Sequence, residues 1–230
     1  MRIYILLIMF VLLADNLFGQ IISIEYAYKE KLDLSQYKNK LPPQVSQVLF
    51  ASNSPIIYSK SYLLRVDKNK SSFKPKDSIP DDIEFPYEGG TIKIHSIEFQ
   101  TNFFIDKDNQ LLLGTIPYRG KMMNIHDTIP FLCWDITNNK KSILGYPATK
   151  AVLEFCNRSI EAWFTTDIPV QAGPLFYGGL PGLILELSID DDFKHYQAIN
   201  ILNDIKNDSI IKEFEHRTTE YLQLSDYCTY

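Results

Sequence analysis

The chain has 230 residues, of which 45% are hydrophobic, and a formal net charge of −5 at pH 7. This length suits one sizeable domain or two small ones, and the composition is typical of a globular chain. The mildly acidic balance gives no sign of the basic patch or stripe that a nucleic-acid-binding surface requires, so we expect no nucleic-acid partner. Aromatic residues make up 13% of the chain, which favours β-structure because aromatic side chains pack well on pleated faces.

The N-terminus has the organisation of a signal peptide. A short basic start, Met1-Arg2, precedes the apolar run Ile3–Ala14, which is shorter than the ~20 residues that a membrane-spanning helix needs. A cleavable signal peptide therefore explains the run better than a membrane anchor does. The small residue Gly19 predicts that residues 1–19 are cleaved, leaving 20–230 as a single domain in the periplasm or outside the cell. We expect no later segment to cross a membrane.

The first third of the mature chain predicts two strands, a short helix and an insertion. Apolar and polar residues alternate over Ile22–Lys29, which predicts a half-buried strand. Two prolines inside Lys40–Ser54 precede apolar residues at helical spacing, which predicts a short helix. The Tyr- and Leu-rich segment Ile56–Val66 predicts a second strand. Asp67–Gly90 contains four lysines and three prolines, so we expect residues 67–90 to form a solvated, mobile insertion.

The rest of the chain predicts a series of strands joined by turns. In Asp208–Leu224, apolar residues at helical spacing predict a C-terminal helix. Polar turns are expected at Asn138–Lys141 and Asp190–Asp192. Strands joined by short turns predict a mainly β (α+β) fold: a curved antiparallel meander or half-barrel with one or two helices. The predicted strands are Thr91–Ile105, Gln110–Ile116, Ile129–Thr137, Ala148–Phe155, Ser159–Thr165, Leu183–Ile189 and Lys194–Leu202.

A glycine-rich run ends in the motif Gly179-Leu180-Pro181-Gly182-Leu183-Ile184. Pro181 followed by Gly182 predicts a type II turn, because proline fixes φ at its second position and glycine takes the positive φ of its third. A strand follows the turn, with alternate residues on one face. A phosphate-binding loop is the weaker interpretation, since the run lacks a Lys-Ser/Thr ending and no helix follows it.

This motif and the residues before it resemble the GLPGLI family of secreted bacterial proteins. The similarity extends over roughly Asp127–Ile201 and includes Trp134-Asp135-Ile136-Thr137, Gly145-Tyr146 and Ala162-Trp163-Phe164-Thr165. The resemblance implies a secreted β-rich protein and no established biochemical activity. The strand pattern is also similar to the open, strongly curved antiparallel sheets of bacterial lipoprotein-carrier proteins.

The chain has three cysteines: Cys133, Cys156 and Cys228. In an oxidising compartment an odd number allows one disulfide and a free thiol, or an intermolecular link. Their spacing does not choose the pair, and it is unlike that of a metal site. For two of the three cysteines, the simpler interpretation is a small hydrophobic side chain buried in the core.

No catalytic or metal-binding constellation is evident. The four histidines are scattered, without an HExxH motif or other paired spacing. Asp190–Asp192 lacks the spacing of a calcium loop, and an acidic turn is the simpler interpretation. No serine lies in a GxSxG motif, and Glu154 and Glu161 at neighbouring strand positions do not define a glycosidase pair. We therefore expect no metal, no cofactor and no catalytic residue, and a hydrolase is the least supported function.

Aromatic residues gather in the region of family resemblance: Trp134, Tyr146, Trp163, Phe176 and Tyr177. Core packing is their ordinary role, but some could line the concave face of a curved sheet and leave a pocket for a lipid-like ligand. The leading hypothesis is a non-enzymatic periplasmic or outer-membrane-associated binding protein. The alternative is an accessory protein that docks on an outer-membrane receptor or export system through the 67–90 insertion or a free strand edge.

Overall fold

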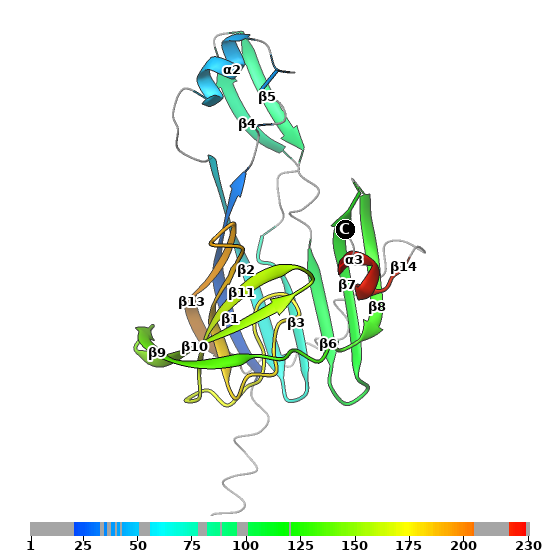
Figure 1. Cartoon of the computed structure of the whole chain (residues 1–230), viewed down its shortest axis with the longest axis vertical. Coiled ribbons are helices and arrows are strands. Elements are labelled where there is room, and N and C mark those ends of the chain that lie inside the picture. The colour runs from blue at the N-terminus through cyan, green and yellow to red at the C-terminus, as the bar shows by residue number, and fades with distance from the viewer. Residues whose placement is uncertain are drawn as a thin grey trace, which may run out of the picture.

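The protein is mainly β and is organised around one large sheet (Figure 1). The computed structural model describes residues 21–32, 35, 38–39, 41, 43–50, 56–77, 82–87, 89–95, 101–119, 121–204 and 221–228. The sheet strands are β1 Ile21–Leu32, β2 Ile56–Asp67, β3 Lys70–Pro75, β6 Asn102–Asp106, β7 Leu111–Tyr118, β8 Lys121–Thr128, β9 Asp135–Ile143, β10 Tyr146–Phe155, β11 Arg158–Thr165, β12 Leu183–Ile189, β13 Lys194–Asp204 and β14 Tyr221–Leu222.

The strand order of this 12-stranded sheet is β14-β8-β7-β6-β3-β2-β1-β13-β12-β11-β10-β9. All neighbouring strands are antiparallel except β14, which runs parallel to β8. The order ends at β14 and β9, so the sheet is open. A separate hairpin pairs β4, Asp82–Tyr87, with β5, Gly90–His95. Figure 1 shows it beside helix α2, Pro43–Phe50, and away from the main sheet.

The main sheet is strongly curved. Phe103 in β6 and Phe155 in β10 both contact Phe176, with ring centroids 5.2 and 5.9 Å from it. These two strands are seven spacings apart in the strand order, which would separate them by about 34 Å in a flat sheet. The sheet must therefore bend round on itself, as the predicted half-barrel requires, and the buried core lies on its concave side.

The central strand β1 shows why this face is apolar. Its residues alternate, and Ile24, Tyr26 and Tyr28 are buried while their neighbours point to the other face. The predicted strands in β1 and β2, the helix α2 and the β12–β13 hairpin are all confirmed. β1 lies between β2 and β13, so the sheet joins the first described strand to one near the end of the chain. This pairing makes the architecture more complex than a simple meander.

The predicted hairpin between 129 and 155 is wrong in its bounds. β8 was not predicted, the stretch from Ile129 to Trp134 forms no strand, and Asn138–Lys141 lies inside β9. The turn is at Leu144-Gly145, where φ is 52° and 84°, as in the type I′ turns that suit two-residue hairpins. β9 is an edge strand and is mostly exposed. A solvated strand has a polar sequence, and over a few residues such a sequence cannot be told from a polar turn.

Two other predictions are corrected in the first half of the chain. Within 67–90, which was predicted as a solvated insertion, Lys70–Pro75 is strand β3 of the main sheet, and its Phe73 is buried against Leu64 of β2. The lysines do not prevent this segment from joining the sheet, because they lie on the opposite face of the strand or at its ends. The face that carries Phe73 is free to be buried. The range predicted as one strand over 91–105 divides into β5 and β6, which belong to different sheets.

Two predictions lie mostly outside the described residues. The signal peptide over 1–19 is one of them, and most of the predicted C-terminal helix is the other. Where that helix range re-enters the described chain, Tyr221–Leu222 is strand β14, and the short helix α3, Leu224–Cys228, follows it. No helix in the described ranges is both long and apolar enough to span a membrane.

Candidate ligand-binding cavity

A cavity of about 510 Å³ lies on the concave side of the main sheet. This volume falls in the 300–1,000 Å³ range of typical small-molecule sites. Strands from distant parts of the chain, the β10–β11 turn, the segment before the glycine-rich motif and helix α3 all contribute to it. Its lining residues are Tyr28, Tyr62, Thr101, Phe103, Ile116, Pro117, Ile125, Phe155, Cys156, Asn157, Arg158, Leu175, Phe176, Tyr177, Ile189, Phe193, Lys194, Tyr196, Leu224 and Cys228.

Three tyrosines form one wall of the cavity. Tyr28 in β1 is the direct register partner of Tyr196 in β13, and their ring centroids are 4.7 Å apart. Tyr62 in β2 lies 5.5 Å from Tyr28 and 5.8 Å from Tyr196. Because paired residues of adjacent strands face the same side, the three rings pack together on the concave face. The result is a continuous aromatic surface.

A second wall comes from the segment before the glycine-rich motif. Phe176 and Tyr177 are stacked with centroids 4.7 Å apart. The backbone fixes this segment: Tyr177 N–H donates to Pro174 O at 3.1 Å. The indole Nε1 of Trp134 donates to Gly178 O at 2.9 Å. The segment is thus held against the sheet by local and distant hydrogen bonds and presents its rings to the cavity.

The GLPGLI motif anchors that segment but does not form the predicted type II turn. Gly182 does not have the required positive φ; among the motif glycines only Gly179 has one, at 83°. Instead Gly182 N–H donates to Leu180 O at 2.8 Å, an i to i+2 bond that marks a γ-turn centred on Pro181. Gly182 is needed because a Cβ there would overlap the backbone of Thr165. The motif is therefore a packing element of the core, where Leu183 and Ile184 are fully buried.

A disulfide forms part of the cavity lining. Cys156 pairs with Cys228, whereas Cys133 is exposed and free. Cys156 and Asn157 have φ of 55° and 56° and form a two-residue turn between β10 and β11. Cys228 belongs to α3, and Leu224 N–H at the start of α3 donates to Asp127 Oδ2 in β8 at 2.8 Å. The disulfide therefore joins parts of the sheet near its two opposite ends.

Polar groups lie at one end of the cavity. Lys194 Nζ is 3.6 Å from Oε1 of Glu30, a carboxylate that is only 2% exposed, and Tyr28 Oη donates to Glu30 Oε2 at 2.6 Å. Arg158 Nη1 lies 2.5 Å from Asp190 Oδ2. Burial, with the nearby Tyr196 and Glu30, raises the pKa of Tyr28, so its phenol stays protonated and remains a hydrogen-bond donor.

The amine of Lys60 is buried on the face of β2 that carries Tyr62. Lys60 is the register partner of Tyr28, and its Nζ is buried with no hydrogen-bond partner among the described residues. Burial lowers the pKa of Lys60 from 10.5 to about 8, against the opposing effect of Asp77. An unsatisfied buried amine destabilises the folded state.

We expect Lys60→Met to raise the free energy of unfolding by about 1 kcal/mol at pH 7. Because the folded pKa is below the unfolded one, the folded state binds fewer protons between pH 8 and pH 10.5, and the parent protein gains stability as the pH rises through that window. The advantage of the variant should therefore shrink. Urea unfolding at pH 7 and pH 10 measures this, with Lys29→Met on the exposed face of β1 as control. An advantage independent of pH would contradict the assignment.

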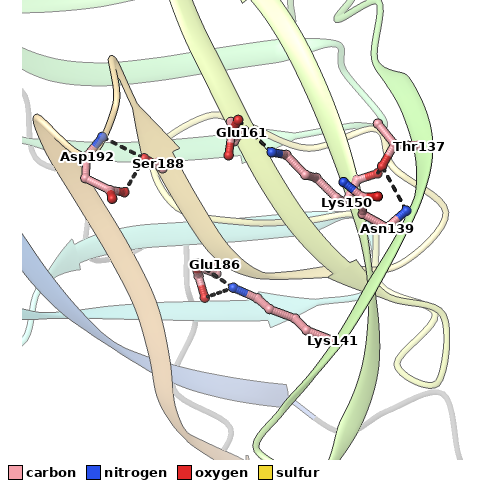
Figure 2. Close-up of polar contacts among 8 residues, drawn as sticks. All are labelled: Thr137, Asn139, Lys141, Lys150, Glu161, Glu186, Ser188 and Asp192. Carbon is pink, nitrogen blue, oxygen red and sulfur yellow. Dashed lines mark hydrogen bonds and ion pairs between the residues drawn. The ribbon is translucent and has the colours of Figure 1, made fainter.

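The outer face of the sheet carries ion pairs rather than a cavity. Figure 2 shows Lys141 of β9 reaching Glu186 of β12, with Nζ 2.7 Å from both carboxylate oxygens. His195 Nε2 lies 3.4 Å from the same carboxylate. Burial by itself raises the pKa of Glu186, but the hydrogen bonds from His195 and Lys141 outweigh it and hold the pKa below 4.5. An ionised and doubly contacted carboxylate is suited to tying β9 to β12 rather than to acid catalysis.

The other acids considered from sequence also have structural roles. Glu161 accepts from Lys150 Nζ at 2.7 Å (Figure 2), and Glu154 is exposed on the same outer face. The triple acid at 190–192 closes the β12–β13 hairpin, as predicted. Within it, Asp192 Oδ1 accepts from Ser188 Oγ at 2.6 Å. The described residues contain no group of three or more His, Cys, Asp or Glu side chains that could hold a metal ion.

The structure brings together only part of the predicted aromatic set. Phe176 and Tyr177 line the cavity, and Trp134 packs beside Tyr177 with centroids 6.3 Å apart. Tyr146 is half-buried against the core and does not line the cavity. Trp163 lies on the outer face, where Lys141 Nζ is 4.3 Å from its ring centroid. The core and ligand-face interpretations thus apply to different members of the set.

Sequence reasoning did not identify the tyrosine wall. Alternation in β1 correctly places Tyr26 and Tyr28 on one face, but it gives no sign that Tyr62 and Tyr196 lie opposite. It also gave no sign of the Cys156–Cys228 pair. The only signal in the sequence was the presence of tyrosine in each of the three strands. Tyrosine indicates which face of a strand is buried, but it does not indicate which strands are neighbours.

Comparison with known proteins identifies a fold and a short family match. Residues 153–186, from β10 to β12, match a family described as "Protein of unknown function (Porph_ging)". A comparison with curated proteins finds no match.

The fold is similar to two crystal forms of a protein named PNGF-II. For the P21 form the TM-score is 0.55 at 16% sequence identity, covering 91% of this chain and 33% of that one. For the C2 form the TM-score is 0.53 at 15% identity, covering 91% and 32%. The chain thus spans about a third of the length of these solved structures. At this identity the similarity to PNGF-II concerns the fold alone, which is a large open β-sheet. The family match is a separate finding: it covers 34 residues of this chain, and the family has no known function.

Proposed function

We propose that this protein is a non-enzymatic periplasmic or outer-membrane-associated binding protein that holds an apolar, lipid-like ligand on its curved sheet. The observation that carries the proposal is the cavity of about 510 Å³ with aromatic rings on both walls. A concave site whose lining combines aromatic and aliphatic side chains with polar groups is a usual form of small-molecule binding site.

The chemistry of the described residues favours binding over catalysis. Glu161 and Glu186 form their ion pairs on the outer face (Figure 2), and Asp190 forms its ion pair at a hairpin end. Glu30 lies beside the tyrosine wall, where it is ion-paired with Lys194 and accepts the Tyr28 hydroxyl. Most of the residues that line the cavity carry phenol, phenyl or aliphatic groups, which bind apolar surface through burial. A hydrolase would need a nucleophile with a base and an orienting partner. The described residues that line the cavity do not form such an arrangement, so they do not support the hydrolase hypothesis.

Two observations support an extracytoplasmic location. The Cys156–Cys228 disulfide is of a kind that persists in oxidising compartments. The sequence over 1–19 has the pattern of a signal peptide. The family match over 153–186 and the GLPGLI motif support assigning the chain to the GLPGLI family of secreted bacterial proteins.

Filling the cavity should weaken binding of an apolar probe. Ile116 in β7 is buried and lines the cavity, so Ile116→Trp would occupy part of its volume. We expect the purified protein to bind the neutral dye N-phenyl-1-naphthylamine with enhanced fluorescence. The dissociation constant should rise at least ~10-fold in Ile116→Trp, a loss of about 1.4 kcal/mol.

The matched control is Ile136→Trp, at a half-exposed position of β9 outside the cavity, which should bind the dye like the parent protein. Thermal unfolding of both variants checks that they fold. Absence of dye binding by the parent protein, or equal loss in both variants, would count against the proposed function.

A second candidate function is docking on an outer-membrane receptor or export system. The open edge strand β9 and the exposed Phe131 in the segment before it favour this alternative, because free edges accept added strands. However, β9 itself carries lysines, and its pairing with β10 contains a register shift. Both features protect edge strands from pairing with other chains, so the cavity is the stronger observation. Crosslinking in intact cells that recovers an outer-membrane protein through β9 would favour docking.

A further inference from the structure

The charged residues of the cavity lining all have the same sign. Of the 20 residues in the lining, Arg158 and Lys194 are charged, and no acidic side chain is among them. The remaining lining is aromatic, aliphatic or neutral polar. A ligand that fills this site therefore meets aromatic and aliphatic side chains together with neutral polar groups, and a cationic surface at one place.

The two cations lie at the same end of the sheet and on the same face. Ile189 in β12 is the register partner of both Ile160 in β11 and Lys194 in β13. Arg158 is two residues before Ile160 and therefore shares its face. The backbones of β11 and β13 are two strand spacings apart, about 10 Å, so two long cationic side chains can reach a group between them.

The acidic partners of these cations hold them at this end. Glu30, on β1, lies beside Lys194 and also accepts the Tyr28 hydroxyl, and Asp190, in the β12–β13 turn, lies beside Arg158. Neither carboxylate lines the cavity. A guanidinium has five N–H donors in a planar fork and binds more than one oxyanion at a time, so its ion pair is compatible with an anionic ligand.

We propose that the cavity binds a single-chain amphiphile with an anionic carboxylate head group, which lies between Arg158 and Lys194 while the chain extends along the aromatic walls. This inference rests on the proposed function and adds the class of ligand. The volume of about 510 Å³ is in the lower half of the range for small-molecule sites, which fits one acyl chain better than a diacyl lipid.

The test compares three ligands of equal chain length for displacement of N-phenyl-1-naphthylamine from the full protein. We expect dodecanoate to displace the dye at a concentration at least ~10-fold lower than dodecanol, and dodecyltrimethylammonium to be the weakest. Equal displacement by the acid and the alcohol, or preference for the cationic amphiphile, would overturn the head-group assignment while leaving apolar binding intact. Failure of both the dye and dodecanoate to bind, the latter by calorimetry, would overturn both proposals.

Charge variants locate the head group. Arg158→Gln with Lys194→Gln should abolish the preference for dodecanoate over dodecanol. Lys150→Gln removes a cation from the outer face, where it pairs with Glu161, and should keep the preference. If the double variant does not fold, Arg158→Gln alone, at a half-exposed side chain, should reduce the preference, and Arg158→Lys should restore part of it. A preference retained in Arg158→Gln would exclude this residue as a head-group ligand.

Discussion

Replacing Cys228 by serine is expected to lower the free energy of unfolding by about 4 kcal/mol. The Cys156–Cys228 bond spans 72 residues of sequence, and the loss of chain entropy for a loop of that size corresponds to about 4 kcal/mol. Cys228 also holds α3, and with it Leu224, over the cavity. Urea unfolding under oxidising conditions measures the stability, and dye titration of the same sample measures whether the cavity stays formed.

The matched control is Cys133→Ser. Cys133 is exposed and free, so its replacement removes a sulfur without removing a cross-link, and stability should stay within about 0.5 kcal/mol of the parent value. Addition of a reductant should lower the stability of the parent and Cys133→Ser proteins and leave that of Cys228→Ser unchanged. Similar losses in the two serine variants would show that the disulfide does not stabilise the fold.

The second large effect is expected at Gly182. A Cβ at this position would overlap the carbonyl oxygen of Thr165 and lie 2.6 Å from its carbonyl carbon. Both contacts are with backbone in the paired strand β11, which cannot move without breaking the ladder to β12. We expect Gly182→Ala to cost at least about 3 kcal/mol, measured by urea or thermal unfolding.

Gly179→Ala separates close packing from backbone strain. Gly179 has a φ of 83°, and the methyl group that alanine would add has no other atom within 4 Å. Alanine there should therefore cost only about 1 kcal/mol, the penalty of the left-handed region. Gly182 has the opposite combination, with no positive φ and no space. A larger loss at Gly179 than at Gly182 would mean that the motif acts as a turn rather than as a packing element.

These two glycines illustrate what the sequence could predict. Pro181-Gly182 has the residue types of a type II turn, and the position of the turn was predicted correctly. Its type was not, because the requirement for glycine comes from a neighbouring strand that local sequence does not reveal. Likewise the hairpin around Asp190–Asp192 was predicted, since its two strands are adjacent in sequence and joined by polar turn residues.

The cavity could not be predicted in the same way. Its tyrosine wall depends on β1 pairing with β2 on one side and β13 on the other, and periodicity assigns a face to each strand without choosing its partner. β3 shows the same limit, because its lysine-rich sequence hides a buried Phe73 that only the sheet explains. The half-barrel class was predictable from the number of strands and turns, but the residues that meet inside it were not.

The pairing of β1 with β13 also has a consequence for biosynthesis. Ile21 pairs with Asp204, which is made 183 residues later, or roughly 10 to 35 seconds at ordinary rates of translation. Throughout that time β1 can pair with β2 on one side only, and its other backbone edge, beside the tyrosines, lacks its final partner. An unpaired apolar strand edge attracts other chains. A nascent chain of this protein therefore needs protection of its first strand until almost the last one has been made.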